Sequence, residues 1–253
     1  MDSYHIDVIT CRGLTKQYAE HAAVSSLDLT IPAGEICCFL GPNGAGKSTT
    51  VKMLTGLLAP TSGTAEVCGL NVAKQPLEVR RLSGTVPEHL GLFDSLTVSE
   101  HLRLTGDVWG LNRRERDSRA AELLAALALE HGADTFASDC SHGMRKKTAL
   151  AMALLPNPRV LFLDEPFEGI DPVTSKTIRE MLKQLSAHGV TVFLTAHILS
   201  IAEEIATRIV FIRGGKKVWD SPPSELPASL EAHYFDLVEA PIPQELKWLG
   251  PGR

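Results

Sequence analysis

The sequence of 253 residues lacks the features that mark several whole classes of protein. No apolar run approaches the ~20 residues that a membrane-spanning helix needs, since the longest are pieces such as 123–129. Lysine and arginine total 25 against 30 acidic residues, which gives a net charge of −5 and no general basic field for nucleic acid. The start of the chain, Met1 to His5, is acidic and polar, unlike a secretory signal. We therefore expect a soluble, intracellular protein that binds no nucleic acid.

Cysteine is scarce and has no functional spacing. The five cysteines, at positions 11, 37, 38, 68 and 140, form no CxxC pair and no Cys/His ligand pattern. They are odd in number and mostly stand among apolar neighbours, which predicts reduced core residues. With 44% hydrophobic and 22% charged residues, a chain of this length can bury a core without disulfides.

Apolar runs typical of strands alternate along the chain with patterns typical of helices. Strands are expected at 6–11 (ending at Gly13), 24–31, 35–40, 64–67, 160–163 and 190–195, helices at 47–58, 115–129, 150–155 and 176–187, and a hairpin at 209–219 turning on Gly214 and Gly215. This alternation predicts an α/β fold with a largely parallel sheet. We expect one domain, 1–253, whose core (about 1–88 and 156–220) carries an inserted helical subdomain at about 89–155. A proline-rich tail is expected at about 221–253.

A glycine-rich turn follows the strand predicted at 35–40 and precedes the next helix. It fits the pattern GxxxxGK[ST], in which backbone N–H groups close around phosphate oxygens and the helix N-terminus adds a positive partial charge. The lysine of this pattern reaches the β- and γ-phosphates, and the hydroxyl binds Mg²⁺. A chance glycine turn is the alternative, expected in about one chain in a hundred of this length. The sequence therefore predicts a nucleotide-binding loop, made of Gly41, Pro42, Asn43, Gly44, Ala45, Gly46, Lys47 and Ser48.

A second element is the apolar strand 160–163, which ends in two adjacent acids, Asp164 and Glu165. Ligands of open α/β sheets bind at the carboxyl ends of such strands. Because successive strand residues point to opposite sides, the two carboxylates cannot share one role. One would hold Mg²⁺ through water, and the other would accept a proton from an attacking water. The alternative is a solvated strand end, which the neighbouring phosphate loop disfavours.

Over about residues 6–220 the chain resembles the ATP-binding subunit of an ATP-binding-cassette (ABC) transporter. Residues 41–49, ending in Thr49, match that family's Walker A motif, and 161–166 match its Walker B motif. The resemblance implies a P-loop NTPase (RecA-like) fold with a mostly parallel sheet core, an antiparallel β subdomain and an inserted helical subdomain. It also implies that Glu165 activates water, and that Asp164 and Ser48 hold the cofactor Mg²⁺ while ATP is the substrate.

Four further positions match family elements in the expected order. By resemblance, Tyr18 stacks on adenine and Val24 lies beside it. Asp171, in the D-loop, touches an opposing subunit, and His197 contacts the γ-phosphate. Taken alone, Tyr18 is a half-buried strand aromatic, Asp171 is a helix cap, and His197 is a core residue.

Two elements depart from the family's pattern. Its signature, usually Leu-Ser-Gly-Gly-Gln, stands here as Cys140, Ser141, His142, Gly143 and Met144. We expect Ser141 to cap a helix and the segment to hold the ATP of an opposing subunit. The family's glutamine near Mg²⁺ is Glu88 in this chain, and we expect its carboxylate to bind ATP-associated Mg²⁺ more strongly than an amide does. The alternative is that Glu88 points away from the metal and only positions the loop that touches the permease.

The resemblance implies an ATP-hydrolysing subunit that couples MgATP binding, dimer closure and hydrolysis to transport, most similar to export, by a separate integral-membrane permease. Two cassettes, a homodimer or a pair, would face head to tail, and the permease would hold them at the cytoplasmic face of the membrane. One alternative is a soluble ABC ATPase acting on nucleic acid or ribosomes, but the chain is net acidic and has no long coiled coil, zinc-binding insert or second cassette. Another is a non-hydrolysing, ATP-gated regulatory subunit, suggested by Glu88 and His142.

Overall fold

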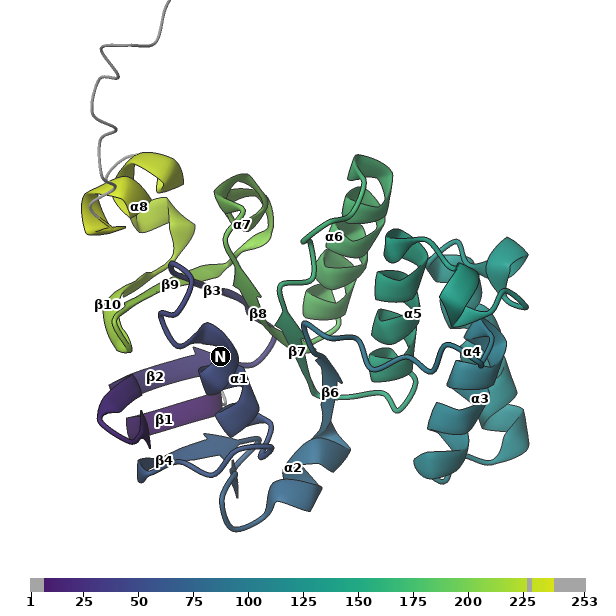
Figure 1. Cartoon of the computed structure of the whole chain (residues 1–253), viewed down its shortest axis with the longest axis horizontal. Coiled ribbons are helices and arrows are strands. Elements are labelled where there is room, and N and C mark those ends of the chain that lie inside the picture. The colour runs from purple at the N-terminus through teal and green to yellow at the C-terminus, as the bar shows by residue number, and fades with distance from the viewer. Residues whose placement is uncertain (1–6, 227–228, 239–253) are drawn as a thin grey trace, which may run out of the picture.

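The computed structural model describes residues 7–226 and 229–238, so Ile6 of the first predicted strand and residues 227–228 and 239–253 of the predicted tail lie outside the described part. A six-stranded sheet forms the centre of the molecule, in the order β10-β9-β3-β8-β7-β6 (Figure 1). Its strands are β3 (Ile36–Leu40), β6 (Ser83–Val86), β7 (Val160–Asp164), β8 (Thr191–Ala196), β9 (Arg208–Arg213) and β10 (Lys216–Ser221). Every pair is parallel except β9 with β10. The predicted parallel sheet and the predicted hairpin are both confirmed.

A second, antiparallel sheet has the strand order β2-β1-β4-β5. Its strands are β1 (Asp7–Tyr18), β2 (His21–Pro32), β4 (Ser62–Val67) and β5 (Leu70–Asn71). The first strand was expected to end at Gly13, but β1 continues to Tyr18. Gly13 has a φ of 56° at an irregularity in the pairing with β2, and its N–H donates to Asp28 Oδ1 at 2.7 Å. Glycine takes this left-handed conformation without steric cost, so the strand bends there and does not end.

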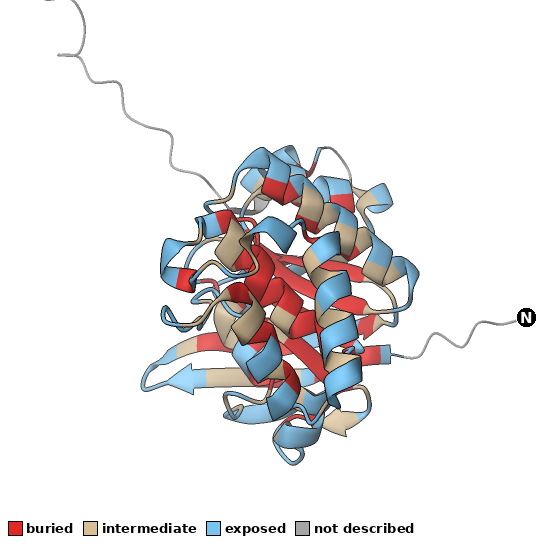
Figure 2. Cartoon of the chain, turned by 90° about the vertical axis from the view of Figure 1, so that its right-hand side faces the viewer, coloured by how far each residue is buried: buried red, intermediate tan, exposed pale blue. Residues whose placement is uncertain are grey.

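Alternate residues of the central strands are buried against two different layers. Cys37 and Phe39 of β3 pack with α1 (Lys47–Leu54) and with the antiparallel sheet. Cys38 and Leu40 face the other way, toward α5 (His142–Leu154), α6 (Pro172–Ala187) and α7 (Leu199–Ile205). Figure 2 shows buried residues, in red, gathered in the interior behind the exposed faces of the outer helices. The predicted burial of this strand on both faces is confirmed, and all five cysteines are free, as predicted.

Three helices make up the middle of the chain, on one side of the sheets (Figure 1). They are α3 (Val98–Val108), α4 (Arg113–Ala126) and α5, with the 3₁₀ turns η1 (Glu130–Gly132) and η2 (Ala137–Asp139) between the last two. A capping box starts α3, because Thr97 Oγ1 accepts the N–H of Glu100 at 3.2 Å and Glu100 Oε2 accepts the N–H of Thr97 at 2.8 Å. The helix predicted at 150–155 is longer than expected, since α5 starts directly after Ser141.

The helix predicted at 47–58 ends earlier, at Leu54. The hydroxyl of Thr55 donates back to the carbonyl of Val51 at 2.9 Å, and Gly56 takes a φ of 65°. A left-handed glycine just after the last turn is a common way to end a helix. The chain then forms β4 and β5, which α2 (Pro76–Leu82) follows. No helix in the described ranges is both long and apolar enough to cross a membrane.

The segment expected to be a tail from residue 221 contains η3 (Pro223–Glu225) and the helix α8 (Leu230–Val238). Leu230 is fully buried, and the rings of Tyr234 and His233 lie 5.7 and 5.8 Å from the ring of Phe211 on β9, centroid to centroid. The expectation of a tail is therefore wrong for these residues, because a buried leucine and an aromatic cluster attach α8 to the core.

Candidate functional site

The glycine-rich loop joins β3 to α1 at the carboxyl end of a central strand (Figure 1). Gly46 has a φ of 105°, and a Cβ there would lie 2.2 Å from the carbonyl oxygen of Ala23 on β2. A Cβ at Gly41 would lie 2.3 Å from the carbonyl oxygen of Ile212 on β9. Both neighbours are backbone atoms of strands, so these two positions require glycine. The loop is thus packed between the two sheets, with α1 starting directly after it.

Lys47 lies inside the loop with only 7% of its surface exposed. Its Nζ donates to the carbonyl oxygens of Gly41 at 2.8 Å and Pro42 at 3.4 Å, and it lies 3.4 Å from Oε1 of Glu165. These partners allow a charged group to be buried. The ammonium therefore sits between the loop and the end of β7.

Asp164, the last residue of β7, and Glu165, directly after it, have different partners, as expected for two carboxylates with separate roles. Oδ1 of Asp164, a residue with 4% exposure, accepts hydrogen bonds from Ser48 Oγ at 3.1 Å and Thr195 Oγ1 at 2.6 Å. Oε2 of Glu165 accepts a hydrogen bond from Nδ1 of His197 at 2.8 Å. Asp164 thus faces the loop hydroxyl, and Glu165 faces the histidine.

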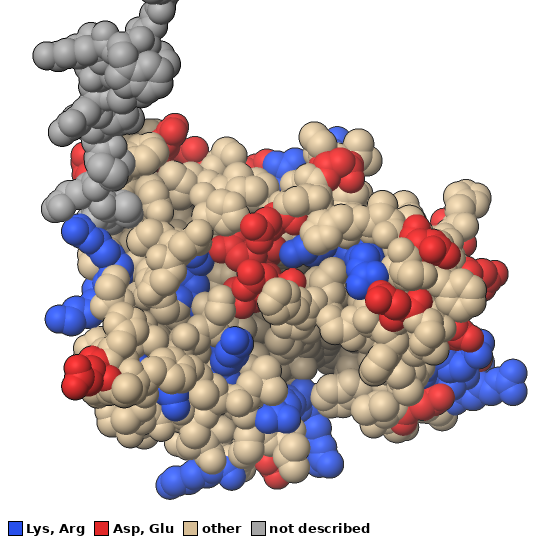
Figure 3. All heavy atoms as spheres, viewed as in Figure 1, with Lys and Arg blue, Asp and Glu red and all other residues tan. Residues whose placement is uncertain are grey.

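Lys47, Ser48, Glu165 and His197 line one pocket of about 590 Å³, whereas the buried Asp164 does not line it. This volume is within the range of ~300–1,000 Å³ that is usual for ligand sites. Its wall consists of the eight loop residues together with Thr49, Ala23, Glu88, Glu165, Glu168, His197 and Tyr234. The structure therefore brings the predicted loop, Glu88 and both predicted catalytic residues to one cavity. On the face drawn in Figure 3, acidic side chains gather at the centre and basic side chains lie on both sides of them.

The two predicted adenine contacts lie outside the wall of this pocket. Tyr18, at the end of β1, is 48% exposed, and the Nζ of Lys16 lies 5.4 Å from its ring centroid. Val24 is fully buried in the core beneath the loop, and its neighbour Ala23 lines the pocket instead. Tyr18 is thus accessible to a ligand, whereas Val24 packs behind Gly46 of the pocket wall and does not reach the cavity.

The signature segment and the predicted D-loop each start a helix. Ser141 caps α5, as predicted, with its Oγ accepting the N–H of Met144 at 3.2 Å. Asp171 caps α6 by accepting the N–H groups of Val173 and Thr174 at 2.9 and 3.0 Å. The hydroxyl of Thr174 also donates to Asp171 at 2.6 Å, and this hydrogen bond, with those from the backbone, holds the pKa of the carboxyl below its usual value.

The two segments are close neighbours in space. A Cβ at Gly143 would lie 2.7 Å from Oγ1 of Thr174, and the exposed His142 donates from Nε2 to the carbonyl of Glu168 at 3.2 Å. None of the predicted signature residues, nor Asp171, lines the pocket of its own chain. The residues expected to act on an opposing subunit therefore form a separate surface.

Besides Ala23 and Glu168 of the pocket wall, sequence reasoning missed Thr195, Lys146 and Tyr234. Thr195 on β8 bonds both to Asp164 and to the N–H of Glu165, the latter at 2.9 Å, and a hydroxyl at the end of an apolar strand is the signal that could have identified it. Lys146 donates to the carbonyl of Glu165 at 2.7 Å. Tyr234 reaches the pocket from α8, a helix that the prolines of this segment conceal.

The fit of Mg²⁺ depends on the oxygen atoms that the loop and β7 present. Within residues 7–226 and 229–238, no group of three or more His, Cys, Asp or Glu side chains could hold a metal ion. Ser48 Oγ and Asp164 Oδ1, 3.1 Å apart, are hard oxygen donors. Mg²⁺ usually takes one or two protein ligands together with phosphate oxygens and waters. The residues present fit a metal ion that arrives with a nucleotide.

Comparison with known sequences identifies the family. Residues 24–168 match the ABC transporter family. The Nod factor export ATP-binding protein I of Cupriavidus metallidurans is 37% identical over 219 residues, which cover 87% of this chain and 72% of that protein. The daunorubicin/doxorubicin resistance ATP-binding protein DrrA of Streptomyces peucetius is 36% identical over 237 residues, which cover 94% and 72%.

Solved structures agree with this result. The ATP-binding subunit of an ABC transporter superposes with a TM-score of 0.83 at 30% identity, covering 91% of this chain and 99% of the other. A dimeric ATP-binding cassette in a post-hydrolysis state, bound to ADP and Pi, superposes with a TM-score of 0.78 at 27% identity, covering 85% and 98%. The predicted P-loop NTPase fold is confirmed. The chain therefore belongs to the ABC transporter family, as an ATP-hydrolysing cassette subunit.

Proposed function

We propose that the pocket hydrolyses MgATP with Glu165 as the general base. The observation that carries this proposal is the place of the Glu165 carboxylate, 2.8 Å from His197 Nδ1 and 3.4 Å from Lys47 Nζ at the edge of the phosphate loop. A carboxylate beside a bound γ-phosphate can accept a proton from the attacking water. The loop and the start of α1 supply the N–H groups that bind phosphate oxygens.

Lys47 and His197, the two partners of the Glu165 carboxylate, also act on ATP. The dense charge of a triphosphate attracts Lys47 to the β- and γ-phosphates and His197 to the γ-phosphate. Both contacts with Glu165 are thereby weakened, and its carboxylate becomes free to take a proton. Ser48 and Asp164 would hold Mg²⁺, which when bound would neutralise charge on the phosphates. Binding of the substrate and activation of the base therefore depend on the same side chains.

Three further assignments follow the same reasoning. Tyr18 stacks on the adenine, because its ring is accessible at the end of β1. Glu88 adds a carboxylate ligand for Mg²⁺ from the pocket wall. The signature segment, Ser141 to Met144, and Asp171 act on the ATP of a second cassette, since they lie outside the pocket of their own chain.

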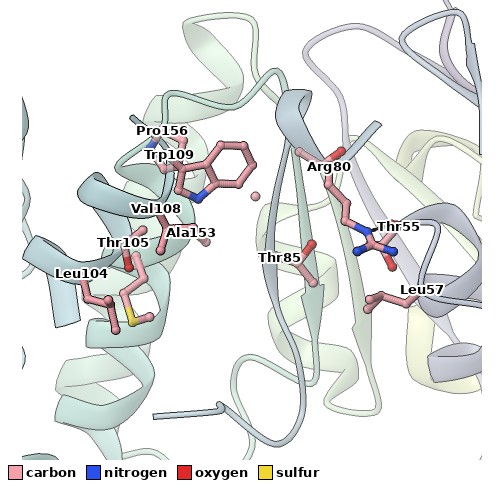
Figure 4. Close-up of a pocket in the computed structure, with 13 residues that line it drawn as sticks. Thr55, Leu57, Arg80, Thr85, Leu104, Thr105, Val108, Trp109, Ala153 and Pro156 are labelled. Atoms are coloured by element: carbon pink, nitrogen blue, oxygen red, sulfur yellow. Dashed lines mark hydrogen bonds between the residues drawn. The ribbon is translucent and has the colours of Figure 1, made fainter. Parts of the chain in front are cut away.

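A groove between the sheets and the helical block supports a separate membrane partner (Figure 4). Its volume is about 390 Å³, with Leu104, Val108 and Trp109 on one wall and Leu57 and Arg80 on the other. Such exposed apolar side chains gathered in one groove typically mark an interaction site. We assign this groove to a cytoplasmic helix of an integral-membrane permease, with an apolar face that meets Trp109. The cassette then lies at the cytoplasmic face of the membrane.

The direction of transport is proposed as export. The relative in Cupriavidus metallidurans is named for Nod factor export, and that in Streptomyces peucetius is named for resistance to daunorubicin and doxorubicin. The substrate of this chain's own system is chosen by the permease and not by the cassette.

Glu165→Gln tests the assignment of the base. The amide keeps the shape of the side chain but cannot take a proton, so turnover should fall by ~10²–10⁴-fold while MgATP still binds. Closed dimers should then accumulate with ATP, as seen by light scattering. Near-normal turnover would place the base elsewhere. An unaltered protein that binds ATP but never turns over, even with its permease, would favour the non-hydrolysing regulatory alternative.

Trp109→Ser tests the groove. The variant is co-expressed with the proposed integral-membrane permease, and co-purification and stimulated ATPase activity are measured. Trp109→Ser should lose co-purification and stimulation but keep the basal ATPase activity. Val218→Ser on β10 is the matched control, because Val218 is also exposed and apolar but lies outside the groove. Equal co-purification and equal stimulation of the two variants would contradict the assignment of the groove to the permease.

A further inference from the structure

Lys146, one turn into α5, is buried, with 3% of its surface exposed. Its Nζ donates a hydrogen bond of 2.7 Å to the backbone carbonyl of Glu165. Burial lowers the pKa of this ammonium, and the carboxylates of Glu168 and Glu165 act in the opposite direction. Lysine is rarely buried without a specific partner, so this contact is a defined feature of the site.

The residue at the other end of this contact has an unusual backbone conformation. Glu165 has a φ of 49°, in the left-handed region that residues with a Cβ disfavour. Its N–H donates to Thr195 Oγ1 at 2.9 Å, while its carbonyl accepts from Lys146. Side chains from β8 and α5 therefore fix the peptide groups on both sides of the Glu165 Cα. Such a conformation persists only where the surroundings hold it.

We propose that Lys146 is a positioning residue for hydrolysis, which holds the carbonyl of Glu165 and thereby aims the Glu165 carboxylate at the attacking water. The proposal rests on the proposed role of Glu165 as general base. It gives α5, whose first residues form the signature segment, a direct link to the base of its own chain. A shift of α5, caused by a second cassette or a permease, would change the backbone from which the base projects.

Lys147 offers a matched comparison on the same helix. It is also buried, with 9% exposure, and its Nζ also donates to a backbone carbonyl, that of Ala128, at 3.2 Å. Burial lowers its pKa as well. Ala128 follows α4 and does not line the pocket. Loss of either lysine removes a buried hydrogen bond, but only loss of Lys146 frees the backbone of the base.

The experiment compares Lys146→Met with Lys147→Met in the full chain, by phosphate release and thermal melting. Both variants should lose similar thermal stability. Lys146→Met should lower kcat at least tenfold and leave KM for ATP within twofold, because the phosphate loop is untouched. Lys147→Met should keep kcat within twofold. Lys146→Arg, which retains a charged donor, should recover most of the lost kcat.

A double variant shows whether Lys146 acts through Glu165. Lys146→Met combined with Glu165→Gln should turn over no more slowly than Glu165→Gln alone. A further loss in the double variant, or equal kcat values for Lys146→Met and Lys147→Met, would overturn the proposal. Near-normal turnover of Glu165→Gln alone would instead overturn the base assignment, so the two failures are distinguishable. If Lys146→Met does not fold, Lys146→Gln, whose shorter neutral side chain loses the charged hydrogen bond, is judged by the same criteria.

Discussion

Lys47→Ala removes an ammonium group that the structure places inside the phosphate loop. Its Nζ lies 2.8 and 3.4 Å from the carbonyl oxygens of Gly41 and Pro42, at the wall of the pocket. We expect Nζ to form two charged hydrogen bonds to phosphate oxygens, at about 1.5–3 kcal/mol each, or about 3–6 kcal/mol together. The Kd for MgATP should therefore rise by about 10²–10⁴-fold.

Isothermal titration calorimetry with MgATP measures this change directly. Lys52→Ala is the matched control, because Lys52 lies on the same helix but is exposed and does not line the pocket. Glu165 keeps its hydrogen bond from His197 in Lys47→Ala, so the fold should be retained, and thermal melting checks this. A Kd for Lys47→Ala within twofold of that for Lys52→Ala would refute a contact between Lys47 and the phosphates.

Three further predictions concern the metal, pairing and stability. Glu88→Gln should raise the Mg²⁺ concentration needed for half-maximal ATPase activity, because hard cations prefer charged oxygen ligands; an unmoved titration would assign Glu88 to a loop that meets the permease. ATPase activity per molecule should rise with protein concentration, since in the proposed dimer each site takes Ser141 from a second cassette, and constant activity through the monomer–dimer range seen by sedimentation would contradict shared sites. Thr97→Ala should lower the free energy of unfolding in urea by about 1 kcal/mol, and an unmoved midpoint would show that the cap is not stabilising. The N–H of Thr97 holds the pKa of Glu100 below its usual value, so this carboxylate stabilises the fold above its unfolded pKa of about 4.3, and urea titrations should show the contribution disappearing as the pH falls through the lower, folded pKa.

Features that depend on consecutive residues could be predicted from the sequence. The phosphate loop and the acids after strand 160–163 are examples, because the same few residues supply both the chemistry and the local geometry. Contacts between distant segments leave no periodic pattern, so the bonds of Thr195 to Asp164 and of Lys146 to Glu165 were not foreseen. Only the folded sheet and helices bring these partners together.

Two other differences have separate physical causes. Ala23 lines the pocket and Val24 does not, because Val24 is fully buried and its side chain packs behind Gly46 of the loop. The helix α8 is concealed by prolines at 222, 223 and 227, which indicate a loop, while its contacts with Phe211 are visible only in three dimensions. Proline marks where a helix cannot continue, but it says nothing of a helix that starts after it.

The contacts of residues 142 and 143 explain why the signature segment can carry histidine in place of its first glycine. A Cβ at Gly143 would lie 2.7 Å from Oγ1 of Thr174 and 3.3 Å from Oδ2 of Asp171, so a larger residue there would push α5 away from the start of α6. His142 is exposed, and its ring turns to the carbonyl of Glu168. The approach of the two helices therefore requires glycine at 143 and places no such demand on 142. Since the cap formed by Ser141 is also intact, histidine at this position changes the surface offered to a second cassette and leaves the packing of its own chain as it is.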